Sequence, residues 1–368
     1  MKSKFLVGVV TLVLLVALIL PACAQPAPAP APSPAPSPTP SPATTGPKTL
    51  KLSYTMPKGV SLASGFEWWG PEFEKRTQGR YKVEIYPGAT LVSIPAALES
   101  VKKGVAEVVM TSIGSFPKDF PLSMVVHLPT LGLPTNNEAD MEKAYEATWE
   151  LYNTFPKVQA EYKDFKLLWS FKLESFNLVS KRKEVHYPSD FKGMKVGGGG
   201  PQMEIVTANG GASVMEAPPQ IYTNIDKGVT EASFLTFAHV DNYKLQEICN
   251  YYYEGDFGNG SLPILMNLQA WNAMSPADQK IMMDSWRDAS KVCATGTITG
   301  RQKGKKVASD KGMKIVQPTA DETAAWENAA TTIAFKKWED DAKSVGIDAG
   351  TIGDVLNGWK KIRAKYMK

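Results

Sequence analysis

Apolar residues recur along this chain with two different spacings, which alternate from about residue 48 onward. Residues 50–54 and 81–86 alternate between apolar and polar positions, as half-buried strands do. Residues 94–101 place apolar side chains on one helical face, and Gly104 after them is a typical helix end. The apolar run 105–111 then predicts a buried strand. This succession of strand and helix predicts an α/β fold with mixed, mostly parallel sheets.

The second half of the chain repeats this arrangement. The phrase KGVAEV at 103–108 is echoed by KGVTEA at 227–232, each where a helix should end and a strand begin. A helix is expected at about 138–155 and a strand at 165–171, and Ser275 before a proline predicts a capped helix start. One copy of the phrase in each half is what two lobes of similar α/β build would give.

The first 47 residues lack the hydrophobic pattern of a folded core. Lys2 and Lys4 precede an apolar run that is too short to span a bilayer, which predicts a signal peptide at 1–22. Leu20-Pro21-Ala22-Cys23 resembles a bacterial lipobox, although Pro21 departs from it, and predicts a lipid on Cys23. Ordinary signal cleavage near Ala24 is the alternative. Residues 23–47 then predict an extended tether, since 10 of the 24 residues after Cys23 are proline.

Composition excludes one class of partner and leaves another question open. Removing Lys2 and Lys4 lowers the formal net charge from +4 to +2, so nothing here indicates nucleic-acid binding. Cys249 and Cys293 could pair in an oxidising compartment. Cys293 falls on an apolar helical stripe and is more simply a small buried hydrophobe.

Four glycines at 197–200 interrupt the chain between a short β-type run at 194–196 and Pro201, which suits the first position of a helix. Glycine lets the backbone approach a ligand, and free N–H groups before a helix make a seat for an anion. A flexible turn without function is the other interpretation.

The order of several phrases resembles the DctP-type solute-binding proteins of TRAP transporters. These phrases are TQGR at 77–80, YPG at 86–88, LP at 128–129, SDFKGMKV at 189–196, IY at 221–222 and SPADQ at 275–279. The resemblance implies two lobes joined by crossing segments and a long helix, closing over an organic acid and delivering it to the small and large membrane subunits. The expected lobes are 48–170 with 262–290, and 171–261 with 291–345, followed by a C-terminal helix at 350–366.

The chain departs from this family where the ligand carboxylate should be held. The family's arginine after the KLKI-type phrase is replaced by Gly197, a second basic residue matches Phe176, and a common asparagine falls on Leu235. We therefore expect an aromatic or longer-chain monocarboxylate, seated on the N–H groups of residues 198–202 with Lys58 or Lys172 as candidate helpers. The expected ligand-binding residues are Tyr54, Trp169, Phe171, Phe176, Gly197, Gly198, Gly199, Gln202, Tyr222, Ser233 and Phe234.

The sequence predicts a receptor rather than an enzyme. His127, His186 and His239 lack a metal-ligand spacing, and no dinucleotide fingerprint, P-loop or nucleophile elbow is present. No catalytic residue, metal or cofactor is expected. We expect an exported lipoprotein in the periplasm or on the outer face of the cytoplasmic membrane. A sensing receptor without transport and an exported hydrolase remain as alternatives.

Overall fold

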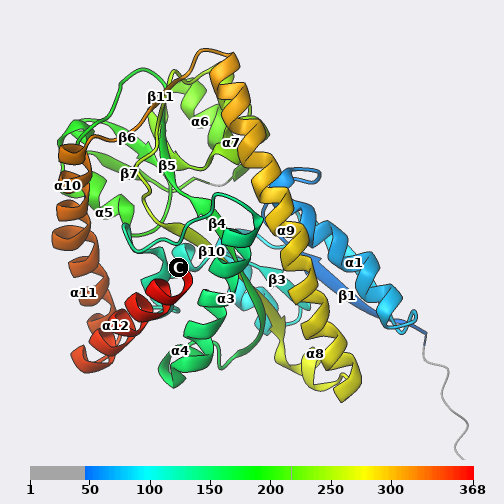
Figure 1. The fold of residues 1–368 in the computed structure, drawn as a ribbon. Coiled ribbons are helices and arrows are strands. Elements are labelled where there is room, and N and C mark those ends of the chain that lie inside the picture. The colour runs from blue at the N-terminus through cyan, green and yellow to red at the C-terminus, as the bar shows by residue number, and fades with distance from the viewer. Residues whose placement is uncertain (1–45, 217) are drawn as a thin grey trace, which may run out of the picture. The chain divides into compact units, whose positions relative to one another are not determined.

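The computed structural model describes residues 46–216 and 218–368 of the chain. The predicted signal peptide, the expected lipid site at Cys23 and the tether up to residue 45 lie outside these residues. The described part contains two β-sheets with helices packed around them, which confirms the predicted mixed α/β fold (Figure 1). Within it, no helix is both long and apolar enough to cross a bilayer, and no group of three His, Cys, Asp or Glu side chains could hold a metal ion.

Sheet A forms from the first strands of the chain together with two long strands that come later. Its five strands lie in the order β2 (Tyr81–Tyr86), β1 (Lys48–Ser53), β3 (Val108–Met110), β10 (Asn259–Asn267) and β4 (Phe165–Ser175). Strand β1 is parallel to both β2 and β3, whereas β10 is antiparallel to β3 and β4. All nine residues of β10 are buried. Helices therefore cover both faces of this strand.

Sheet B has six shorter strands. They lie in the order β11 (Lys314–Val316), β9 (Tyr251–Tyr253), β5 (Asn177–Ser180), β8 (Ala232–Leu235), β6 (Lys195–Gly197) and β7 (Ala212–Val214). Strand β6 is parallel to β7 and β8, and β9 is parallel to β11. Strand β5 is antiparallel to its two neighbours. Parallel pairs thus slightly outnumber antiparallel ones in the described residues, as predicted.

Two chain segments cross from one sheet to the other side by side. Strand β4 continues into β5 with only Phe176 between them, and β9 continues into β10 through residues 254–258. The two crossings are joined because Phe176 N–H donates to Gly258 O (2.8 Å) and Phe257 N–H donates to Phe176 O (2.8 Å). These are the crossing segments that the family resemblance implied.

Twelve α-helices of the described residues cover the sheets. They are α1 (Ser64–Arg76), α2 (Ala97–Lys102), α3 (Glu138–Thr154), α4 (Pro156–Ala160), α5 (Gln202–Ala208), α6 (Ile221–Lys227), α7 (Phe237–Asn242), α8 (Leu268–Asn272), α9 (Pro276–Asp310), α10 (Ala320–Ala329), α11 (Lys336–Ser344) and α12 (Ala349–Tyr366).

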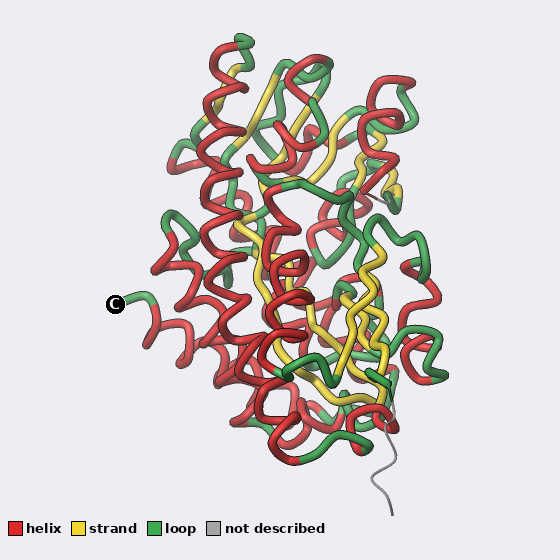
Figure 2. Tube along the Cα trace, turned by 90° about the vertical axis from the view of Figure 1, so that its right-hand side faces the viewer, coloured by secondary structure: helices red, strands yellow, loops and turns green. Residues whose placement is uncertain are grey.

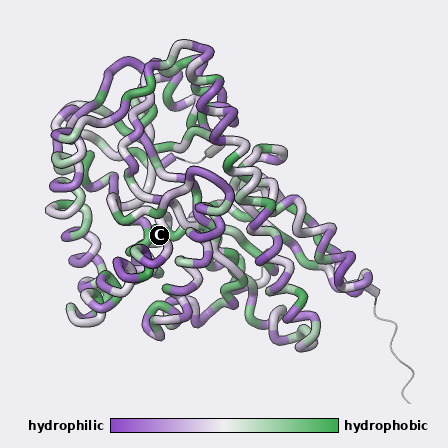
Figure 3. Tube along the Cα trace, in the orientation of Figure 1, coloured by the Kyte–Doolittle hydropathy of each residue, from purple (hydrophilic) through white to green (hydrophobic). Residues whose placement is uncertain are grey.

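Helix α9 is the predicted long helix and runs alongside both sheets (Figures 1 and 2). Its start is capped as expected, since Ser275 Oγ accepts from Asp278 N–H (3.1 Å). Near this end Trp286 stacks on Trp69 of α1, with ring centroids 4.4 Å apart. Near the other end, a methyl group on Gly304 would overlap the Phe237 carbonyl, so glycine lets α7 approach closely. Hydrophilic and hydrophobic stretches alternate along this helix (Figure 3), as expected for one buried face.

The C-terminal helices contact both sides of the junction between the sheets. Trp326 of α10 packs against Phe191 on the sheet B side, at 5.6 Å between centroids. Trp338 of α11 instead donates its indole N–H to Pro121 O (2.6 Å), in a loop packed on sheet A. Helix α11 falls in the range expected for the second lobe, yet its buried tryptophan belongs to the core beside sheet A. Cys249 and Cys293 are both free and buried, and for Cys293 this agrees with its position on an apolar helical stripe.

Candidate ligand-binding cleft

Two adjoining cavities lie at the junction of sheets A and B. We call them the His127 cavity, of about 160 Å³, and the Trp338 cavity, of about 210 Å³, after one residue that lines each. Their walls come from both sheets. They share Gly114, Gly198, Gly199 and Met215, so we treat them as one cleft.

The cleft lies where parallel strands of both sheets end. Thr55 follows β1 and Ser112 follows β3, and both line the His127 cavity from the side of sheet A. On the side of sheet B, Gly198 follows β6 and Leu235 is the last residue of β8. Ligands of α/β proteins commonly bind in a crevice beyond the carboxyl ends of such strands. This position is the one expected for a ligand site.

A carboxylate occupies the space that a side chain at position 197 would need. Gly197 ends β6, and a methyl group built on it would overlap Glu216 Oε2 and lie 2.5 Å from Ser233 Oγ. Glu216 lies between β7 and α6 and lines the His127 cavity. Its oxygens accept from Ser233 Oγ (2.7 Å), Thr230 Oγ1 (2.9 Å) and Asn224 Nδ2 (3.1 Å). No side-chain cation among the described residues forms an ion pair with it.

The two histidines of the His127 cavity are neutral at physiological pH. Burial, together with the nearby charge of Lys172, lowers the pKa of His127 to about 3, and burial lowers the pKa of His239 to about 4. His127 Nε2 accepts from Ser261 N–H (2.7 Å), and His239 Nδ1 accepts from Thr236 N–H (3.1 Å). A backbone N–H thus holds each ring, from β10 for His127 and from the start of α7 for His239, and neither ring adds positive charge to the cleft.

Lys172, a candidate helper for a carboxylate, is buried behind the cleft rather than in it. Its ammonium donates to Val126 O (2.9 Å) and Asn259 O (3.2 Å), and the residue is 1% exposed. Burial lowers its pKa to about 7. The other candidate helper, Lys58, is exposed in the loop after β1 and is not among the residues that line either cavity.

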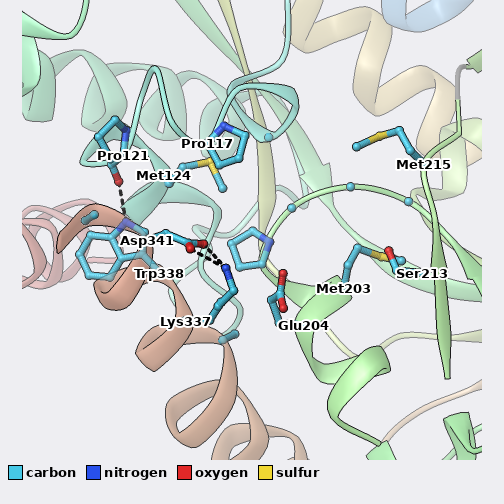
Figure 4. A pocket seen from close by; sticks show the side chains of 17 residues that line it. Pro117, Pro121, Met124, Met203, Glu204, Ser213, Met215, Lys337, Trp338 and Asp341 are labelled. Atoms are coloured by element: carbon cyan, nitrogen blue, oxygen red, sulfur yellow. Dashed lines mark hydrogen bonds and ion pairs between the residues drawn. The ribbon is translucent and has the colours of Figure 1, made fainter. Parts of the chain in front are cut away.

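The Trp338 cavity holds the one lysine among the residues that line the cleft (Figure 4). Lys337 of α11 is paired with Asp341 one turn later, at 2.5 Å. Glu204 of α5 lines the same cavity (Figure 4). With Glu216 in the neighbouring cavity, acidic side chains therefore outnumber basic ones around the cleft.

The glycine turn keeps two backbone donors free among the described residues. Gly198 N–H is used by Val214 O (3.1 Å), and the side chain of Gln202 donates back to Gly199 O (2.6 Å). The N–H groups of Gly199 and Gly200 have no acceptor within the described chain. Helix α5 begins at Gln202, one residue later than predicted, because Pro201 serves as its preceding cap.

Four of the predicted ligand-binding residues lie in the wall of the His127 cavity. Gly198 and Gly199 contribute backbone after β6, and Phe176 and Phe234 contribute rings from the crossing segment and from β8. Gly197 and Ser233 lie just beneath, where Glu216 covers them. That these residues contact a ligand stays a prediction.

The remaining predicted side chains are not among the residues that line the two cavities. Tyr54 stacks on Phe66 in the core of sheet A, with its hydroxyl donating to Glu67 (3.1 Å), and Trp169 and Phe171 are buried in the same core. Tyr222 lies outside both cavities, beside Glu247. The Gln202 side chain is turned onto its own loop. In each case packing or a local hydrogen bond already uses the side chain.

Three residues of the cleft were missed by sequence reasoning. Glu216 carries no motif, and its importance arises only because a glycine 19 positions earlier leaves room for it. His127 is a lone histidine without a metal-ligand spacing, and Trp338 lies in the range 291–345 expected for the second lobe, where no motif marks it. Amphipathic spacing predicts that a tryptophan is buried, but not which cavity it borders.

Comparison with known proteins places the chain in a family. The sequence profile described as "Bacterial extracellular solute-binding protein, family 7" (DctP) matches residues 52–341. The chain belongs to this family, as its sequence resemblance indicated. It is a solute-binding protein of the TRAP transporter type, and this DctP family consists of extracytoplasmic receptors rather than enzymes.

Relatives of this DctP-family chain include proteins with different ligands. A TRAP periplasmic solute-binding protein from Desulfovibrio salexigens is 26% identical, with a TM-score of 0.72 over 87% of this chain and 96% of that one. A TRAP solute-binding protein from Rhodoferax ferrireducens, in complex with copurified benzoate, is 24% identical, with a TM-score of 0.75 over 86% and 98%. A monocarboxylate 2-oxoacid-binding periplasmic protein from Nostoc sp. is 25% identical over 85% of this chain and 83% of its own length.

Proposed function

We propose that this chain captures an organic acid in the cleft between its two sheets and delivers it to the small and large membrane subunits of a TRAP transporter. The observation that carries the proposal is the place of the cleft. It lies at the carboxyl ends of parallel strands from both sheets, and its walls come from both. Closure of the two sides over a solute would therefore enclose it completely.

The ligand we favour has an aromatic or longer-chain apolar body and a single carboxylate. Phe176, Phe234 and Leu262 give the His127 cavity an apolar wall. A second carboxylate would find no free cation among the described residues of the wall, since Lys337 is paired with Asp341. One carboxylate could bind the free N–H groups of Gly199 and Gly200, which are close to Lys337 in the same cavity. Relatives that bind benzoate or monocarboxylate 2-oxoacids support this size and class.

We also propose that the chain acts outside the cytoplasm, held at the membrane by a lipid on Cys23 and spaced from it by residues 23–47. The family assignment supports export, and the lipobox-like sequence supports the anchor.

A cavity-filling pair of variants tests the binding site. A methyl group on Gly199 meets only the Met215 side chain, at 3.7 Å, so alanine fits there, and we expect a larger side chain to extend into the cleft. Protein purified without unfolding should release a solute that mass spectrometry detects. Gly199→Phe should lose this solute while Gly199→Ala keeps it, with both variants melting near the native temperature. Retention of the solute by a folded Gly199→Phe variant would place the site elsewhere. Chemical conversion of the solute would instead indicate an enzyme.

A further inference from the structure

Glu216 gives the cleft a charge that an organic-acid site would avoid. The carboxylate has about four acceptor positions and uses three of them on neutral donors, from Ser233, Thr230 and Asn224. Ser233 and Thr230 are fully buried, so these donors hold the carboxylate in one place. One acceptor position remains for a ligand. A fixed carboxylate with neutral partners leaves its negative charge uncompensated.

The surroundings of Glu216 do not neutralise it. Lys and Arg are absent from the described residues that line the His127 cavity, and His127 and His239 stay uncharged down to acidic pH because they are buried. Position 197, which faces this carboxylate, is a glycine and offers it no charged partner. Any side chain there would displace Glu216, so the glycine and the carboxylate form a matched pair.

The same cavity offers two aromatic rings. Phe176 and Phe234 line it together with Glu216. The face of an aromatic ring attracts ammonium groups, and this attraction grows when the pair is removed from water. A carboxylate and two rings around an apolar space are complementary to a positively charged nitrogen attached to an apolar body.

We propose that the His127 cavity selects a ligand with a positively charged amine on an apolar body, and that Glu216 receives this amine. The inference rests on the proposed function, because it assumes that the cleft binds the solute. It narrows the expected monocarboxylate to one with an amine, such as an apolar or aromatic amino acid. The carboxylate of such a ligand would lie on the Gly199 and Gly200 N–H groups, and its ammonium on Glu216.

Matched ligands separate the two charges. Phenylalanine carries both charges, 2-phenylethylamine carries only the amine and 3-phenylpropionate carries only the acid. Isothermal titration calorimetry at pH 7 should show that the two amines bind more tightly than the acid. Glu216→Gln should weaken both amines by about ten- to a hundred-fold, since it removes a charged hydrogen-bond acceptor, and should leave or improve binding of the acid.

Glu327→Gln is the control, because it removes an exposed carboxylate of α10 that lines neither cavity of the cleft. It should leave the amine preference unchanged. Tighter binding of the acid than of both amines would overturn the inference, and so would failure of both amines to bind or amine affinity that Glu216→Gln leaves unaltered. These calorimetry results would not refute the proposed function. That proposal is tested separately by whether the Gly199 variants retain the copurified solute. A solute without a basic nitrogen would overturn the inference alone.

Discussion

Replacing Gly197 with alanine should destabilise the protein because the new methyl group takes the space of the Glu216 carboxylate. The methyl would overlap Oε2 and lie 2.5 Å from Ser233 Oγ, so the carboxylate must leave its seat. The variant then loses three hydrogen bonds and leaves the fully buried hydroxyls of Ser233 and Thr230 without their acceptor. The backbone at Gly197 is not in the left-handed region, so alanine adds no backbone strain.

The size of this destabilisation depends on the buried hydroxyls of Ser233 and Thr230. The displaced Glu216 carboxylate contributes little because water can solvate it. An unsatisfied buried polar group costs about 1–3 kcal/mol, and a glycine-to-alanine change returns about 0.4–1 kcal/mol by restricting the unfolded chain. We expect a net loss of about 2–4 kcal/mol in the free energy of unfolding by the same estimates. For a domain of this size that corresponds to a fall of roughly 3–6 °C in Tm.

Chemical unfolding of Gly197→Ala and Gly199→Ala provides the comparison. A methyl group on Gly199 meets only Met215 at ordinary contact distance, so this control should be as stable as the native protein or slightly more stable. The double variant Gly197→Ala, Glu216→Ala should lose less stability than the sum of the two single variants, because the new methyl group no longer overlaps a carboxylate. Part of the cost should persist, since Ser233 Oγ is still close. Equal stability of Gly197→Ala and Gly199→Ala would refute the reasoning.

Three further predictions concern other parts of the chain. Since burial lowers the pKa of Lys172 to about 7, the unfolded chain binds more protons between pH 7 and its ordinary pKa of 10.5. The stability of the native protein relative to Lys172→Met should therefore rise over pH 7–9.5, by at most about 1.4 kcal/mol per pH unit in urea unfolding, and a flat difference would contradict this. Gly258→Ala should cost more stability than Gly312→Ala in the same assay; both glycines have positive φ, but only a methyl on Gly258 would meet a backbone oxygen, that of His127, at 2.8 Å. Cys23→Ser should move the protein from the membrane to the soluble fraction, and a native protein that is already soluble and starts at Ala24 or later would contradict the anchor.

Regular elements could be predicted from the sequence where a local pattern determines them. The alternating run at 81–86 is strand β2 with the same bounds, and the predicted helix at 138–155 is α3, which ends one residue earlier. The capped start at Ser275 opens α9 as expected. The strand expected at 165–171 is longer, because β10 pairs with it as far as Ser175. Strand length depends on a partner almost 100 residues away, which local spacing does not encode.

The wall of the cleft was harder to predict for a related reason. Aromatic residues at strand ends were expected to face a ligand, yet Tyr54, Trp169 and Phe171 face helices on the other side of sheet A. Alternation tells which residues of a strand share a face, but not which face borders a cavity. The four glycines could be placed at the cleft because a strand followed by a bare turn marks a strand end. The position of Glu216 in the cleft could not be predicted, because it depends on the space that the missing side chain of Gly197 leaves.

Phe176 links the binding cavity to the place where the two sheets join. Its backbone N–H and C=O form the hydrogen bonds with Gly258 and Phe257 that hold the two crossing segments together, while its ring lines the His127 cavity. A methyl group on Gly260 would lie 3.0 Å from this ring, so the ring has little freedom to turn on that side. A ligand that packs on Phe176 therefore acts on the segment that must bend if the lobes close. The two crossing segments would form the hinge of the proposed closure, and a ligand favours closure only if it contacts Phe176 more strongly in the closed arrangement than in the open one.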